Sequence, residues 1–323
     1  MVKAPLKRIP KMNNLLQRVV MALLLVPLAI GILWLPPLAQ VGVCALVGVR
    51  CLFEWFSMSH PQQPWKPLMH FLGCMILCVL VPVSLSYPQW NNSLYLSRLE
   101  TLGLKWIPIG LLVYGITAWF WKSYKSPLKK LTIAGAVYIV LGVVALLLVM
   151  VRGGKQLMID TLLTVWVTDI GAYFTGKWLK GPRMAPVISP NKTWSGFVGG
   201  IFWACLLGLF ADGISWSDGS SEGMSGMTWL FKSLGVPFVK APPSYWWILG
   251  SFTIALVAHG GDFLESWAKR KFGVKDSGQL IPGHGGLLDR LDSLLSVSLF
   301  LGLCFLCIVL YTIIGLLCGF VAK

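Results

Sequence analysis

Residues 289–321 read DRLDSLLSVSLFLGLCFLCIVLYTIIGLLCGFV, in which two aspartates and an arginine precede an apolar run from 294 to 321. A run of about 20 apolar residues is long enough to cross a bilayer as a helix. The charges that come before this run place ionisable groups at the end of a membrane span. The stretch therefore predicts a transmembrane helix with a charged site at its entrance.

Similar apolar runs recur along the whole chain, which is 56% hydrophobic and only 12% charged. A soluble domain usually has about 25% charged residues. The runs are continuously apolar, whereas a transmembrane β-barrel would show short alternating segments. We therefore expect an all-α polytopic membrane protein with about nine transmembrane helices. The expected spans are residues 19–35, 38–57, 68–86, 104–121, 132–150, 157–176, 195–212, 246–265 and 294–321.

The formal charge of +15 is explained by membrane topology. Lys and Arg accumulate in cytoplasmic loops, and here most of them fall on the side of the N-terminus. We therefore expect a cytoplasmic N-terminus and an outside C-terminus. The cations form no groove interleaved with aromatic residues, so no nucleic-acid partner is expected. We divide the chain into N-terminal transmembrane helices, 1–150, and a C-terminal transmembrane catalytic region, 151–323.

Three aspartates near the cytoplasmic side are candidate metal ligands. Asp262 lies near the end of the eighth expected span, while Asp289 and Asp292 open the ninth and share one helical face. Ionisable groups at membrane depth are costly and usually functional. Favourable contact with a helix N-terminus could explain Asp289 or Asp292 singly, but not Asp262. Oxygen ligands without Cys or paired His suit one or two Mg²⁺ ions, with Mn²⁺ as the alternative.

The polar stretch 266–292 also contains groups that suit a phosphate-bearing ligand. Its cations can pair with phosphate oxygens, and its glycines allow close backbone approach. The candidate residues are Lys269, Arg270, Lys275, Gly285, Gly286 and Arg290. His284, which stands between glycines, is interpreted either as a catalytic base or as a hydrogen-bonding loop residue.

A second group of candidate residues lies upstream, on a loop expected to face the same side. Asp169 falls inside an apolar run, which is costly without a role. Ser189, Lys192 and Thr193 precede a helix, and a helix N-terminus favours anions. Lys192-Thr193 lacks the upstream glycine spacing of a P-loop, so we reject that motif. Small residues every four positions from 196 to 208 indicate a helix-packing face.

These motifs together resemble the phosphatidate cytidylyltransferases, also called CDP-diacylglycerol synthases. The resemblance is carried by Ser266, Lys269-Arg270, Lys275-Asp276, Pro282, His284-Gly285-Gly286, Asp289-Arg290 and Asp292, with support from 169–177 and 189–200. The first 130 residues match only in hydropathy, with Glu54-Trp55 as a weak similarity.

The resemblance implies transfer of a cytidylyl group from CTP to phosphatidic acid, with release of pyrophosphate, in a bacterial inner membrane. CTP, phosphatidic acid and membrane lipids are the implied partners, and a homodimer is left open. The resemblance implies a metal centre at Asp262, Asp289 and Asp292. Lys192, Lys275, Arg290 and His284 are the expected catalytic residues. Substrate binding is expected from Ser189, Thr193, Lys269, Arg270, Gly285, Gly286 and Asp169.

One position departs from the pattern of the family. The family usually has Glu after its Lys-Thr-aromatic run, and this chain has Ser195. A paralogue with an altered lipid acceptor or weak activity is therefore an alternative. A CTP-using lipid kinase and a cation-coupled membrane transporter are the others, although no internal repeat of the transporter kind is found.

Overall fold

The structure is a computed structural model that describes residues 14–62, 64, 67–68, 128–152, 154–210, 244–281 and 285–317. Within these ranges the chain is almost wholly helical, as expected, with one small antiparallel sheet. The helices are α1 (Asn14–Ile32), α2 (Pro37–Ser59), α6 (Lys129–Arg152), α7 (Gly154–Leu179), α8 (Trp194–Phe210), α10 (Ser244–Lys271) and α11 (Leu288–Leu317).

Five of the described helices, α2, α6, α7, α10 and α11, are long and apolar enough to cross a membrane. The apolar part of α1 and the helix α8 are shorter. The protein is therefore an integral membrane protein by length and composition. The expected spans 68–86 and 104–121 lie outside the described residues, apart from Leu68.

The observed helices extend beyond the expected spans at several ends, because the apolar pattern stops where charges begin. The clearest case is α10, expected to end at residue 265 but continuing to Lys271. Its last turn carries Lys269, Arg270 and Lys271, which interact favourably with the negative end of the helix dipole. Asp262 therefore lies within α10 and not at its end.

The expected loop 177–194 contains a β-hairpin. Strand β1 (Arg183–Ala185) pairs antiparallel with β2 (Ser189–Thr193), and Arg183 lies opposite Thr193. The hydroxyl of Thr193 accepts a hydrogen bond from the Gly196 backbone N–H at 3.1 Å. Thr193 thus caps the N-terminus of α8, a position where Thr is favoured. The hairpin leads directly into this helix.

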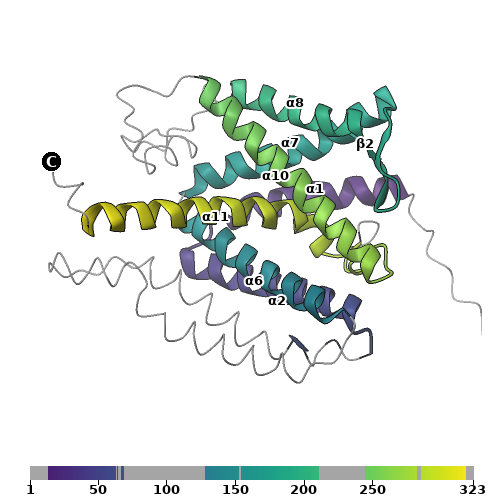
Figure 1. The fold of residues 1–323 in the computed structure, drawn as a ribbon, viewed down its shortest axis with the longest axis horizontal. Coiled ribbons are helices and arrows are strands. Elements are labelled where there is room, and N and C mark those ends of the chain that lie inside the picture. Colours follow the sequence, from purple (N-terminus) through teal and green to yellow (C-terminus); the bar gives the residue numbers. More distant parts are fainter. Residues whose placement is uncertain are drawn as a thin grey trace, which may run out of the picture.

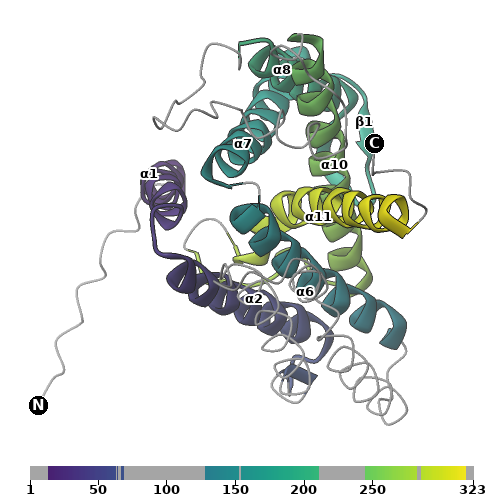
Figure 2. The ribbon, with the colours of Figure 1, turned by 90° about the vertical axis from the view of Figure 1, so that its left-hand side faces the viewer.

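Helix α11 runs through the middle of the described bundle, with α6 on one side and α10 on the other (Figures 1 and 2). Helix α2 packs against α6, and α8 packs against α7 and α10. Close approach of α8 depends on glycine. A Cβ at Gly200 would lie 2.8 Å from the Thr168 carbonyl oxygen, and one at Gly208 would lie 2.7 Å from that of Trp247. The small-residue stripe is therefore a packing face, as expected.

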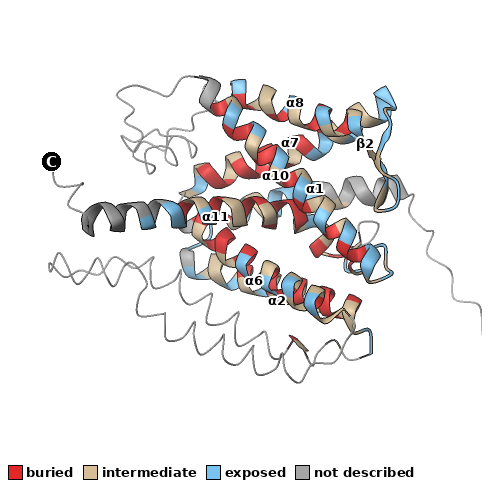
Figure 3. Cartoon of the chain, in the orientation of Figure 1, coloured by how far each residue is buried: buried red, intermediate tan, exposed pale blue. Residues whose placement is uncertain are grey.

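Buried residues gather where α11 crosses its neighbours (Figure 3). Leu52 and Phe56 of α2, Ile139 of α6, and Leu295 and Leu301 of α11 are almost completely buried in one hydrophobic cluster. The apolar side chains on the outer faces remain exposed. That distribution suits a bundle surrounded by lipid, since an exposed leucine is not costly in a membrane.

Candidate active site

Four charged residues from four elements form an accessible group near one end of the bundle. Lys192 of β2 makes an ion pair with Asp262 of α10, with 2.7 Å between Nζ and Oδ2. Both side chains keep about a quarter to a third of their surface exposed, at 25% and 32%. The charges of Asp262, Lys192 and Arg290 also act on Asp169 of α7. We call these four residues the accessible charged group.

A second set of charges, the buried charged group, lies between α10 and the start of α11. It consists of Glu265, Lys269, Asp289 and Asp292, all mostly buried. The Lys269 ammonium is 2.6 Å from an Asp289 oxygen and 3.4 Å from a Glu265 oxygen. The charge of Asp292 acts on Glu265, and the charge of Asp262 acts on Asp292. The two groups are therefore electrostatically continuous.

The carboxylate of Asp289 organises the stretch that precedes α11. It accepts hydrogen bonds from the backbone N–H of Ser277 at 2.9 Å and of Gly286 at 2.8 Å. Gly285 has a positive φ of 87°, and a Cβ there would lie 2.7 Å from an Asp289 oxygen. Gly285 also exchanges backbone hydrogen bonds with Ile281. The glycines at 285 and 286 thus allow the backbone to wrap closely around this carboxylate.

The sequence analysis predicted that Asp262, Asp289 and Asp292 converge, and they lie at the same junction of α10 and α11. Within the described part of the chain, no three carboxylate, His or Cys side chains form a complete metal site on their own. Such a finding still suits Mg²⁺, which commonly binds one or two carboxylates and completes its shell with water and substrate phosphates. Asp262 and Asp292 fit this role best, because Lys269 and backbone N–H groups already contact Asp289.

Several other candidate residues have structural contacts of their own. Arg270 donates from Nε to the Ile188 carbonyl at 3.0 Å, and so connects α10 to the hairpin. Ser189 opens β2, and Thr193 caps α8. Lys275 is exposed in the turn after α10. His284 lies outside the described residues.

Sequence reasoning missed Glu54 as a site residue and noted it only as a weak similarity. Its carboxylate is 1% exposed and accepts hydrogen bonds from the backbone N–H groups of Leu287 at 3.1 Å and Leu288 at 2.9 Å. The Ser277 hydroxyl donates to it at 3.2 Å, and Arg50 pairs with it at 3.1 Å. A charged residue inside an otherwise apolar helix was the available signal.

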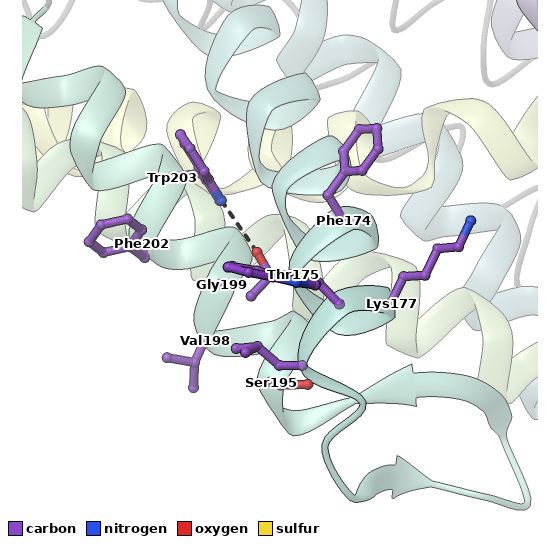
Figure 4. A pocket seen from close by; sticks show the side chains of 10 residues that line it. Phe174, Thr175, Lys177, Ser195, Val198, Gly199, Phe202 and Trp203 are labelled. Atoms are coloured by element: carbon purple, nitrogen blue, oxygen red, sulfur yellow. Dashed lines mark hydrogen bonds between the residues drawn. The ribbon is translucent and has the colours of Figure 1, made fainter.

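An apolar groove of about 880 Å³ lies between α7 and α8 (Figure 4). Phe174, Trp178, Val198 and Phe202 contribute to its lining, and the Trp203 indole N–H donates to the Thr175 hydroxyl at 3.3 Å. Such a lining offers few groups to a charged nucleotide. The groove is therefore a lipid-facing recess, distinct from the two charged groups.

Ser195 lines the same groove and links the two ends of the hairpin. Its hydroxyl accepts a hydrogen bond from the Gly181 N–H and donates one to Thr193, both at 3.1 Å. Among the described residues it makes no contact with either charged group. Its place in the structure is that of a residue that stabilises the hairpin.

Comparison with known proteins identifies the relatives of this chain. Residues 16–309 match the family described as the cytidylyltransferase family. The match therefore begins well before the motifs between 169 and 292, so it includes the helices for which the sequence analysis found only a hydropathy match.

Individual relatives agree with this family match. A phosphatidate cytidylyltransferase of Brucella suis biovar 1 (strain 1330) is 31% identical over 292 residues, which cover 89% of this chain and 92% of the relative. A phosphatidate cytidylyltransferase of Haemophilus influenzae is 32% identical over 295 residues, covering 86% and 94%. One from Staphylococcus aureus (strain COL) is 38% identical over a shorter range of 145 residues.

Proposed function

The chain belongs to the cytidylyltransferase family, and we propose that its two charged groups form the site at which CTP and phosphatidic acid are converted to CDP-diacylglycerol and pyrophosphate. The observation that carries this proposal is the convergence of carboxylates and cations from α7, β2, α10 and α11 at one end of a membrane bundle. Phosphate-rich substrates require such a combination of charges.

The reaction is a substitution at the α-phosphorus of CTP. An oxygen of the phosphatidic acid phosphate forms a bond to this phosphorus. The bond from the phosphorus to the oxygen that bridges it to the β-phosphate breaks, and pyrophosphate leaves. The attacking phosphate is already anionic near neutral pH, so the step needs no strong general base. The protein contributes mainly positioning and charge stabilisation.

The cations of the site divide into paired and exposed ones. Lys192 is held by Asp262 yet remains partly exposed, which places it at the entrance to the accessible charged group. We assign Lys192, Lys275 and Arg290 to the phosphate oxygens of the two substrates. Lys269 is buried against two carboxylates, so we assign it to holding Asp289 in place.

A divalent cation, Mg²⁺ or Mn²⁺, would neutralise phosphate oxygens of CTP. Asp262 and Asp292 would hold it, and Asp289 would join them only by giving up part of its contact with Lys269. Asp169 lies within electrostatic reach of both other aspartates and adds to the negative potential that attracts a cation.

The topology that we propose places this end of the bundle at the cytoplasmic leaflet of the bacterial inner membrane. The C-terminal ends of α2, α7 and α10 and the N-terminal ends of α8 and α11 meet there. This agrees with the positive-inside distribution of Lys and Arg. CTP would arrive from the cytosol, and phosphatidic acid would enter sideways from the leaflet.

The test is a direct transfer assay. The protein purified in lipid–detergent micelles, with Mg²⁺, labelled CTP and phosphatidic acid, should give a lipid-soluble nucleotide and pyrophosphate. Asp289→Asn should abolish the product, while Asp160→Asn should retain it. Asp160 is a matched control because it lies elsewhere on α7, where Gln156 donates to it at 3.0 Å. Equal activity of both variants would remove Asp289 from the site.

A panel of acceptors separates the alternatives. Phosphatidic acid should be used well, and diacylglycerol should be inert, since only the former supplies an anionic phosphate. Product from diacylglycerol would indicate a lipid kinase. Preference for another lipid phosphate would indicate a paralogue with an altered acceptor. Membership of the cytidylyltransferase family disfavours the transporter alternative.

A further inference from the structure

Glu54 of α2 contacts a stretch of chain more than 200 positions later. Its two oxygens accept from Leu287 N–H, Leu288 N–H and the Ser277 hydroxyl, and one of them also pairs with Arg50. The stretch from Ser277 to Leu288, which we call the signature loop, connects α10 to α11. Glu54 therefore contacts both ends of the signature loop.

The contacts satisfy a need of α11 that the helix cannot meet alone. The first N–H groups of a helix have no intrahelical partner. Leu288 is the first residue of α11, and its N–H points to Glu54. A carboxylate at this position also interacts favourably with the positive end of the helix dipole. Glu54 acts as an N-terminal cap supplied by a distant helix.

The packing around this carboxylate leaves no room for another arrangement. A Cβ at Gly286 would meet the Ser277 hydroxyl and a Glu54 oxygen, and one at Gly278 would lie 3.1 Å from the Glu54 carboxyl carbon. A buried carboxylate in a membrane helix is costly unless hydrogen bonds compensate it. The glycines of the signature loop allow that compensation by letting the backbone close around Glu54.

Ser277 connects Glu54 with the reaction. Its hydroxyl donates to Glu54, and its backbone N–H donates to Asp289. The Asp289 carboxylate also depends on Gly286 N–H, and Gly286 closely approaches Glu54. Any displacement of the signature loop from Glu54 therefore moves both backbone donors of Asp289.

We propose that Glu54 is a positioning residue, which holds the signature loop so that Asp289 is presented to the substrates in its productive place. This inference rests on the proposed function, because it assigns Glu54 a role in that reaction. Glu54 would not touch the substrates. It would act through Ser277, Gly286 and the start of α11.

The test uses two variants of α2 in the full-length protein. Glu54→Gln keeps the size of the side chain but replaces one acceptor oxygen with a donor NH₂, which opposes the N–H and hydroxyl donors around it. Cys51→Ala is the control, since Cys51 is fully buried three residues earlier on the same helix. Two quantities are measured for each variant, namely hydrogen–deuterium exchange of peptides covering 277–288 and the kinetics of cytidylyl transfer.

Glu54→Gln should speed exchange in the signature loop and leave exchange in α6 and α7 unchanged. Its kcat should fall by about 100-fold, the size of effect that a displacement of roughly 1 Å can cause, while KM for CTP changes far less. Cys51→Ala should alter neither. Slow exchange and normal kcat in Glu54→Gln would overturn the proposal, as would equal changes in every helix.

A second variant keeps the test decisive if Glu54→Gln does not fold. Ser277→Ala removes only the hydroxyl contact, so it should give the same pattern at smaller amplitude. Unchanged exchange and kcat in Ser277→Ala would then refute the proposal. If the wild-type protein makes no lipid-soluble nucleotide, the proposed function fails, and exchange alone decides whether Glu54 holds the loop.

Discussion

Removal of the Lys269 ammonium should destabilise the protein more than removal of any neighbouring surface charge. In Lys269→Met the side chain keeps its length and apolar character and loses only its charge. Asp289 and Glu265 would then remain buried without their cation, with side chains only 7% and 5% exposed. Solvent would screen these charges weakly.

The size of the effect follows from what remains around each carboxylate. Breaking a buried ion pair by removing one partner costs about 3–5 kcal/mol. Asp289 keeps its hydrogen bonds from Ser277 N–H and Gly286 N–H, which places the cost near the lower end, at about 3 kcal/mol. At roughly 2–4 °C per kcal/mol, the melting temperature should fall by about 6–12 °C.

The assay is thermal unfolding in detergent micelles, followed by tryptophan fluorescence. Lys271→Met is the matched control, because Lys271 is exposed two residues later on α10 and contacts only the Trp267 ring, 5.9 Å away. That variant should lose under about 1 kcal/mol. Adding Glu265→Gln to Lys269→Met should recover part of the loss, since it removes an unpaired carboxylate. If Lys269→Met melts together with Lys271→Met, the buried pair does not carry this stability.

Three further predictions concern the packing of α8, the phosphate contacts and the metal. Gly200→Ala should cost about 1–3 kcal/mol in a thermal melt because its Cβ would press on the Thr168 carbonyl, whereas Gly260→Ala, with open space around it, should not destabilise; equal melts would contradict the packing argument. Lys192→Ala should raise KM for CTP in the transfer assay and free Asp262, and an unchanged KM would remove Lys192 from the phosphate site. Chelation of divalent cations should stop transfer and added Mg²⁺ should restore it; turnover in excess chelator would exclude the metal proposal.

The helical architecture could be predicted from the sequence because hydrocarbon-length apolar runs have few alternatives in a membrane. The convergence of Asp262 with Asp289 and Asp292 could also be predicted, since the ends of consecutive spans share a side. The boundaries were less accessible. Helix α10 continues past its apolar part to Lys271 because its basic last turn is compatible with a helix C-terminus, and hydropathy does not register that preference.

Other features depend on contacts that leave no local pattern. The strands of the hairpin are too short to show alternation, so 183–193 was expected to be loop. The bond between Lys269 and Asp289 joins residues on different helices, although the i, i+4 spacing to Glu265 was visible. The contact between Glu54 and Leu288 is the extreme case. Neither residue is unusual within its own segment, and only the packing of α2 beside α11 brings them together.

This long-range contact changes how the site should be understood. The chemistry-bearing residues all lie after residue 168, yet the start of α11 is capped by Glu54 of α2. Tyr138 of α6 also donates to the Asp292 carbonyl at 3.3 Å, so a second early helix contacts the same turn. Because α2, α6 and α11 share one hydrophobic cluster, the early helices form part of the wall that positions the aspartates. Relatedness that extends back to residue 16 is what such a shared core requires.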